Sequence, residues 1–142
     1  MHKLSIVTLV SVIALALTSG ALRSQQAAPQ VVGERTYQAF ELEDLLAQRE
    51  ESEQAYLPFL NVDSLNCGIY ALTAGAFDGQ SPHGDDEVYY IIKGKGVLRV
   101  DGDDQLVKGG SIVYVKADIE HQFHSIEEDL TMLVFFAEGL DK

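Results

Sequence analysis

The sequence predicts an all-β domain, a barrel or sandwich of short strands, with one short helix before it. After about residue 60, apolar and polar residues alternate with a period of two, which is the period of a half-buried strand. Turn-forming clusters rich in Gly, Asp and Lys interrupt this alternation roughly every ten residues, and no segment of helical period lies between them. Short strands at this spacing are typical of barrels and sandwiches.

The predicted strands are short, and turn residues bound each of them. They cover residues 65–73, 87–93, 96–101, 111–116, 121–126 and 130–137. The turns between them cover residues 94–96, 102–104, 108–110, 117–118 and 127–129. Within a strand, successive side chains leave opposite faces, so alternation also predicts which side chains point into the domain.

The first 21 residues are predicted to be a signal peptide (residues 1–21). Lys3 gives a positive start, residues 4–17 are almost wholly apolar, and Ser19-Gly20-Ala21 offers small residues for cleavage. This apolar core of about 14 residues is shorter than the roughly 20 that span a bilayer. An uncleaved membrane anchor is the alternative. We expect the mature protein to be periplasmic or secreted, without membrane attachment after cleavage.

Three segments are predicted after the signal peptide: a linker (residues 22–35), an N-terminal arm (36–59) and a β-domain (60–138). The linker is polar, with Pro and Gly. In the arm, the apolar residues between Phe40 and Tyr56 follow a helical period, and Pro58 is expected to end the helix. Leu42, Leu45 and Leu46 form its apolar face.

The charge of the chain limits its partners. The 142 residues include 22 acidic and 10 basic ones, a formal net charge of −12. Such a chain repels phosphate backbones and anionic lipids, so we expect no nucleic-acid partner and no peripheral membrane binding.

His83 and Glu87 are candidate metal ligands. An extended strand would separate them by about 13 Å, whereas metal ligands must bring their donor atoms within about 2.0–2.2 Å of one ion. The chain must therefore bend between them, and Gly84-Asp85-Asp86 supplies turn residues. We expect His83 to close one strand and Glu87 to open the next.

His121 is the third candidate ligand. It follows the turn at Ala117-Asp118, and alternation places His121, Phe123 and Ser125 on one face of its strand. His124 then belongs to the opposite face and is excluded from the site, unless a bulge shifts the register.

Two segments resemble the motifs of the cupin superfamily. Residues 75–94, GAFDGQSPHGDDEVYYIIKG, resemble the first motif: Gly, five residues, His-x-His, three or four residues, Glu, six residues, Gly. Residues 110–125, GSIVYVKADIEHQFHS, resemble the second: Gly, five residues, Pro-x-Gly, two residues, His, three residues, Asn. The short segment between the motifs is similar to that of small single-domain bacterial cupins.

The resemblance implies a double-stranded β-helix, or jelly roll, with a metal near one end of the barrel and often a homodimer. By position, His83, Glu87 and His121 match the family's ligands. Ser81 stands where the first histidine of the motif belongs, which leaves two histidines and one carboxylate. Three further departures, Lys116, Asp118 and Ser125, replace the usual Pro, Gly and Asn.

Two imidazoles and a carboxylate with open positions suit Fe(II) and accept Mn, Zn or Ni, so the metal identity stays open. The alternative is a metal-free cupin in which His83 and Glu87 pair through a hydrogen bond. We expect Tyr89, Phe123 and Ser81 to contact a substrate, Tyr89 by donating a hydrogen bond or proton.

The cupin fold serves isomerases, oxygenases, lyases and non-catalytic modules, so the resemblance does not decide whether this protein is an enzyme. One hypothesis is an exported cupin that binds a divalent metal and converts a small polar metabolite by oxygenase, isomerase or lyase chemistry. The other is a non-catalytic small-ligand or metal-binding module.

Overall fold

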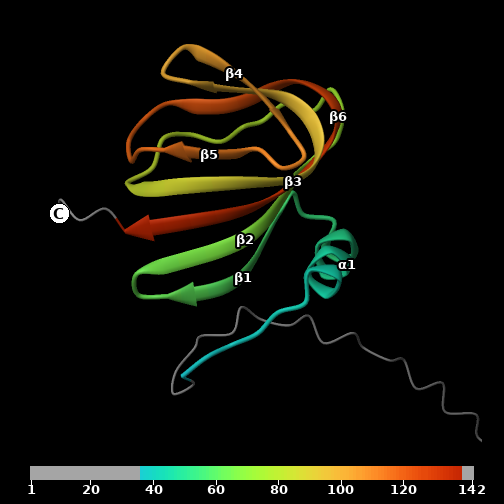
Figure 1. Cartoon of the computed structure of the whole chain (residues 1–142), viewed down its shortest axis with the longest axis vertical. Coiled ribbons are helices and arrows are strands. Elements are labelled where there is room, and N and C mark those ends of the chain that lie inside the picture. Colours follow the sequence, from blue (N-terminus) through green and yellow to red (C-terminus); the bar gives the residue numbers. More distant parts are fainter. Residues whose placement is uncertain (1–35, 139–142) are drawn as a thin grey trace, which may run out of the picture.

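The computed structural model describes residues 36–138, which form one helix and an antiparallel sheet (Figure 1). In chain order the elements are α1 (Leu42–Ser52), β1 (Tyr56–Val62), β2 (Leu65–Leu72), β3 (Asp85–Val100), β4 (Asp103–Lys108), β5 (Ile112–Val115) and β6 (His121–Glu138). The prediction of an all-β domain with a short N-terminal helix is confirmed. The predicted signal peptide and linker lie outside the described residues. Within residues 36–138, no helix has the length and apolarity needed to cross a membrane.

The sheet is built around two long neighbouring strands. Its order is β1-β2-β6-β3-β4, and β5 pairs with the first part of β3. β3 and β6 pair from Asp85 with Glu138 to Val100 with His121, which is nearly their whole length. Both strands bend in Figure 1, so the sheet curls over on itself and encloses a core.

The bends of β3 and β6 correct the sequence prediction, which divided each of these strands in two. Gly94 lies in β3 with φ 95°, and a side chain there would overlap the backbone of Asp129. The pairing of β3 with β6 shifts register between Ile91 and Val97. In β6, Ser125 has φ 46° and is exposed, which breaks the alternation after Phe123. Residues predicted as turns, 94–96 and 127–129, are thus bends inside continuous strands.

Two strands, β1 and β4, were not predicted from the sequence, and both lie at edges of the sheet. The sequence predicts turns at residues 102–104 and 108–110, which overlap the two ends of β4, and no strand between them; only Val107 is buried in β4. β1 begins where the sequence predicts the end of the helix, at Tyr56 and Pro58. Proline is tolerated there because β1 is an edge strand, and its register shifts just after Pro58. The helix itself ends earlier than expected, at Ser52, followed by Glu53 in a left-handed conformation with φ 57°.

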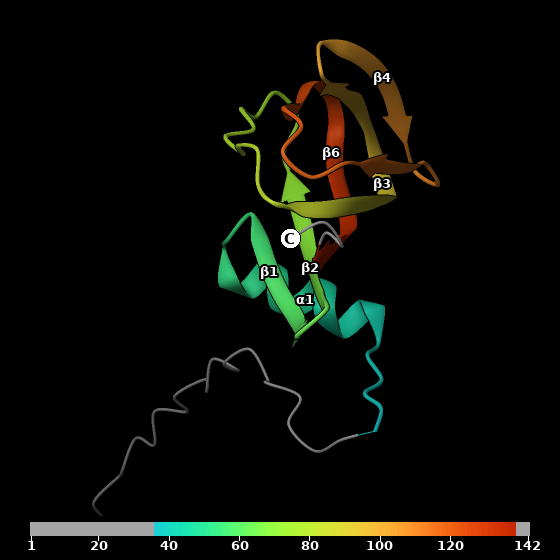
Figure 2. The same ribbon diagram turned by 90° about the vertical axis from the view of Figure 1, so that its left-hand side faces the viewer.

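The curled sheet buries different residues on its two faces. Side chains of the inner face form the main core: Leu72, Tyr89, Ile91, Leu98, Val107, Val115, Phe123, Ile126, Leu130, Met132 and Val134. On the outer face, α1 contacts β1 and β2 (Figure 2). Leu45 of α1 is buried, as are Cys67 and Ile69 of β2. The inner face also carries the polar residues of the candidate site.

Candidate metal centre

Two loops bring the candidate ligands together. Residues 73–84 connect β2 to β3 and place His83 just before β3, and residues 116–120 place His121 at the start of β6. The amide N–H of Asp118 in the second loop donates to the carbonyl oxygen of His83 at 2.8 Å. Asp118 has φ 63°, the left-handed conformation for which the family motif uses glycine. An aspartate therefore makes this turn without the glycine.

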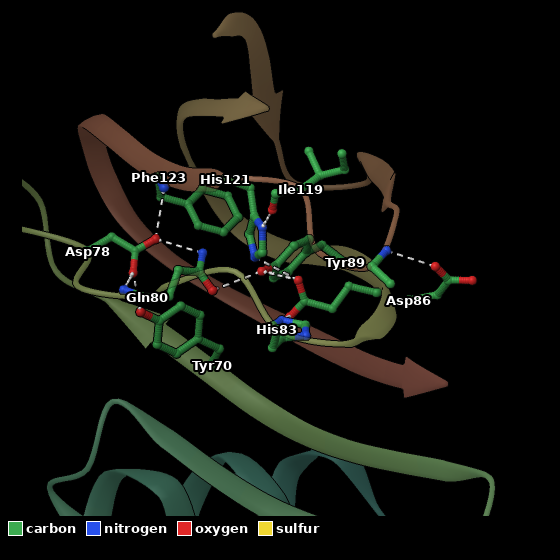
Figure 3. Close-up of polar contacts among 11 residues, drawn as sticks. Tyr70, Asp78, Gln80, His83, Asp86, Tyr89, Ile119, His121 and Phe123 are labelled. Atoms are coloured by element: carbon green, nitrogen blue, oxygen red, sulfur yellow. Dashed lines mark hydrogen bonds and ion pairs between the residues drawn. The ribbon is translucent and has the colours of Figure 1, made fainter. Parts of the chain in front are cut away.

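His83, Glu87 and His121 converge, as the sequence predicts. One ligand atom from each lies within 4.8 Å of the other two. Nε2 of His83 is 3.4 Å from Oε1 of Glu87, and Nε2 of His121 is 2.9 Å from Oε2 of the same carboxylate. Glu87 and His121 are buried, whereas the side chain of His83 is 31% exposed. Figure 3 shows the two imidazoles approaching from different loops.

A hydrogen bond to a backbone carbonyl fixes the orientation of the His121 ring. Its Nδ1 lies 2.7 Å from the carbonyl oxygen of Ile119, so Nδ1 carries a hydrogen and donates it (Figure 3). In the neutral ring, Nε2 then carries the lone pair, and it lies 2.9 Å from Oε2 of Glu87. Nε2 is buried and has no hydrogen-bond partner among the described residues. Two buried acceptors this close to each other need a cation near both of them, which is either a proton on His121 or a metal ion.

Glu87 also raises the pKa values of two neighbours, His121 and Tyr89. Burial lowers the pKa of His121, but the nearby Glu87 carboxylate, the Ile119 carbonyl and Asp78 together raise the pKa above its ordinary value. Burial and the charge of Glu87 raise the pKa of the Tyr89 hydroxyl, so this phenol stays protonated. The Tyr89 hydroxyl donates to Oε2 of Glu87 at 2.8 Å, and Oε1 of Gln80 is a second acceptor at 3.0 Å.

Asp78 is a buried carboxylate that sequence reasoning missed. It lies in the loop before β3, is 1% exposed, and accepts hydrogen bonds from the Tyr70 hydroxyl, the backbone and side-chain amides of Gln80, and the backbone N–H of Phe123. The side chain of Gln122 donates to its backbone carbonyl. Asp78 therefore ties the loop that carries His83 to β2 and β6 (Figure 3). The sequence around it, FDGQ, carries only a turn signal.

A cavity of about 300 Å³ opens beside the cluster. His83 and Glu87 line it, together with Gln80 and the rings of Tyr56, Tyr70, Tyr89 and Phe136. His121 does not line the cavity, although it touches Glu87. The volume is at the lower end of the range for small-molecule sites.

The remaining predicted residues lie in different surroundings. Tyr89 is fully buried and lines the cavity. Phe123 is buried behind it, with ring centroids 5.2 Å apart, and does not line the cavity. Ser81 is exposed and is also absent from the lining. His124 points away from the cluster, with its ring nitrogens 3.1 Å from Asp104 and 3.0 Å from Ser125. Substrate contact by Tyr89, Phe123 and Ser81 stays a prediction.

Comparison with known proteins identifies the family. The family model of the cupin domain matches residues 68–136. The uncharacterized protein SCO3923 of Streptomyces coelicolor is 44% identical over 99 residues, which are 70% of this chain and 94% of that protein.

Solved structures share the fold. A cupin protein from Bacteroides fragilis matches with a TM-score of 0.57 and 19% identity, over 76% of this chain and 89% of that one. The DMSP lyase DddQ from Ruegeria pomeroyi matches with a TM-score of 0.52 and 21% identity, over 57% of this chain. The match spans only 42% of that lyase. These likenesses confirm the predicted jelly-roll fold, and together with the matching family model and the sequence relative they place the chain in the cupin superfamily.

Proposed function

We propose that this protein is an exported cupin that binds one divalent transition metal through His83, Glu87 and His121. The observation that carries the proposal is the pair formed by the Glu87 carboxylate and the Nε2 atom of His121. Both are buried and 2.9 Å apart, the hydrogen on Nδ1 leaves Nε2 free to bind a cation, and Nε2 has no hydrogen-bond geometry toward the carboxylate or any other described residue.

The residues fit a metal ion in three respects. Ligand atoms bound at about 2.0–2.2 Å to one ion stand roughly 3 Å apart, which agrees with the two separations of 2.9 and 3.4 Å. Both ring nitrogens of His83 are buried without a hydrogen-bond partner among the described residues. The Ile119 carbonyl behind His121 and the Tyr89 hydroxyl on Glu87 are the outer contacts that orient metal ligands.

A bound ion would act as a Lewis acid at positions left open to the cavity. The donor set of two imidazoles and a carboxylate suits Fe, Mn, Zn or Ni. The protein's own part is to hold these ligands rigidly and to admit a small polar metabolite through the cavity that His83 and Glu87 line. We propose conversion of such a metabolite, of oxygenase, isomerase or lyase type. The similarity to DMSP lyase DddQ does not single out lyase chemistry, because it shows the fold alone.

The competing function is that of a metal-free cupin module. In that case His121 forms an ion pair with Glu87 when it is protonated, and the nearby Glu87 carboxylate favours this by raising the pKa of His121. Both alternatives use the same atoms, so metal content decides between them.

Metal analysis of the purified protein tests the proposal. We expect about one transition metal ion per chain in protein reconstituted with Mn, Fe, Ni or Zn and then dialysed. His83→Ala and His121→Ala should lose it. His124→Ala is the matched control, because His124 points to Asp104 and should leave retention intact. Equal loss from His121→Ala and His124→Ala, or no retention by the parent, would overturn the proposal.

Export rests on the N-terminal sequence alone. We propose cleavage after Ala21 and a periplasmic or secreted location. N-terminal sequencing of the mature protein should begin between residues 20 and 29. Recovery of an intact Met1 from a membrane fraction would contradict export.

We also propose that the outer face of the sheet forms a homodimer contact. Ile112 and Tyr114 of β5 are 71% and 58% exposed, and Tyr90 beside them on β3 is 39% exposed. Apolar side chains grouped in this way are typical of interaction surfaces. Sedimentation analysis should show a dimer that Ile112→Asp dissociates; a monomeric parent would exclude it.

A further inference from the structure

The walls of the cavity beside the metal site are mainly aromatic. Tyr56, Tyr70, Tyr89 and Phe136 contribute rings. The rings of Tyr56 and Phe136 meet edge to face with centroids 6.1 Å apart, and the ring of Phe136 also meets the imidazole of His83 at 5.3 Å. The Tyr56 ring lies over Gly68, where any side chain would overlap it. The two rings are nearly perpendicular, so this wall offers an apolar corner close to a candidate ligand, in which a flat group can lie on one ring and meet the edge of the other.

Most polar groups in the cavity wall are already used within the protein. The Tyr70 hydroxyl and the Gln80 side-chain amide donate to Asp78, and the Tyr89 hydroxyl donates to Glu87. The exceptions are the Tyr56 hydroxyl and the ring nitrogens of His83, one of which is assigned to the metal: none of them makes a hydrogen bond with a residue in the described range. A ligand with many hydroxyl groups would therefore leave water without finding partners, which costs binding free energy for each group.

The charge of the wall also limits the ligand. No Lys or Arg is among the described residues that line the cavity, and Glu87 is. A divalent ion with the single charge of Glu87 leaves a net charge of about +1, which one negative charge on a ligand neutralises. A phosphate ester carries more negative charge and would find no basic side chain to bind it.

Resting on the proposed metal site, we infer that the ligand has an oxygen-donor head with at most one negative charge and a flat apolar body. A hydroxycarboxylate or ketocarboxylate with an aromatic or unsaturated group has this chemistry, and sugars and phosphate esters do not. The head binds the ion, and the body lies against Tyr56 and Phe136. The cavity of about 300 Å³ holds roughly the volume of ten water molecules, so the ligand is small.

Three probes that share one head and differ in the tail test this inference. Mandelate, glycerate and 3-phosphoglycerate are all 2-hydroxycarboxylates, with phenyl, hydroxymethyl and phosphorylated tails. Titrated into the Ni-loaded full-length mature protein, mandelate should bind at least tenfold more tightly than glycerate, and 3-phosphoglycerate should bind most weakly. Equal affinities, or tightest binding of either other probe, would overturn the inference.

Variants then locate the preference. Tyr56→Leu removes an aromatic wall and should lower the preference for mandelate over glycerate severalfold, whereas Tyr56→Phe keeps the ring and should retain the preference. Equal preference in the leucine variant and the parent would contradict the assigned wall. The metal content of each protein is measured first: a parent without metal refutes the proposed function, whereas a metal-loaded parent without tail preference refutes only this inference.

Discussion

Two buried carboxylates, Asp78 and Glu87, differ in the hydrogen bonds that they accept, although contacts through Gln80 and Tyr89 connect them. Asp78 and Glu87 are each 1% exposed. Asp78 accepts hydrogen bonds from four donors on three segments of the chain. Glu87 accepts one, from Tyr89, and otherwise faces two imidazole nitrogens that have no hydrogen-bond geometry toward it.

The number of hydrogen bonds distinguishes a carboxylate that stabilises the fold, Asp78, from one that can bind a cation, Glu87. A buried charge is costly unless hydrogen bonds or an opposite charge compensate it. At Asp78 the compensation is complete within the fold and holds loop 73–84 in place. At Glu87 the negative charge is fully compensated only when His121 is protonated or a metal ion is bound, which is the property of a binding site.

The largest expected effect is on folding stability at Asp78. Asp78→Ala leaves the Tyr70 hydroxyl, the Gln80 amides and the Phe123 N–H without their acceptor. The free energy of unfolding should fall by about 3 kcal/mol or more. Glu87→Gln in metal-free protein should change it by less than about 1 kcal/mol. Urea denaturation of both variants in the presence of a chelator measures the two changes in the free energy of unfolding. Equal decreases would contradict the different roles of Asp78 and Glu87.

Tyr89→Phe should weaken the binding of metal at Glu87. It removes the one donor that orients Glu87. Loss of such an outer contact typically weakens metal affinity by about 10–100-fold. Tyr70→Phe is the matched control, because its hydroxyl serves Asp78 instead. Competition titration with a chromophoric chelator should show the loss in Tyr89→Phe only, and a similar loss in both would count against separate roles.

The fold was more predictable from sequence than the network around the site. His83, Glu87 and His121 belong to motifs with fixed spacing, so their convergence could be predicted before the structure. Asp78 could not, because its burial depends on Tyr70 and on the backbone of Phe123, which are distant in the sequence. The edge strands β1 and β4 were missed because edge positions tolerate Pro58 and exposed polar residues.

The pH dependence of the metal-free protein provides a further test. Since the pKa of His121 is raised above its ordinary value in the folded protein, protonated His121 stabilises the fold. This contribution is fully present below the unfolded pKa of 6.5 and is lost as pH rises through the folded pKa. The stability of the parent relative to His121→Gln should therefore decline with rising pH, while metal affinity increases. A pH-independent difference in urea denaturation would contradict the pairing of His121 with Glu87.

The smallest expected effect is at the turn that positions His83. Asp118 adopts a left-handed conformation, in which glycine has no side-chain clash. Asp118→Gly keeps the N–H that donates to His83 and should raise the free energy of unfolding by up to about 1 kcal/mol. Asp118→Val should lower it. Thermal denaturation compares the two variants, and a stabilising valine would show that this turn is not under strain.

The central claim, that Glu87 is left incompletely compensated in order to bind a metal, is tested most directly by crystallography of metal-loaded protein at the metal absorption edge. We expect one anomalous peak per chain, about 2.0–2.2 Å from the Nε2 atoms of His83 and His121 and from a Glu87 oxygen. We expect no peak at Asp78. No peak at His83, Glu87 and His121 after loading, with Glu87 bonded directly to a protonated His121, would contradict it.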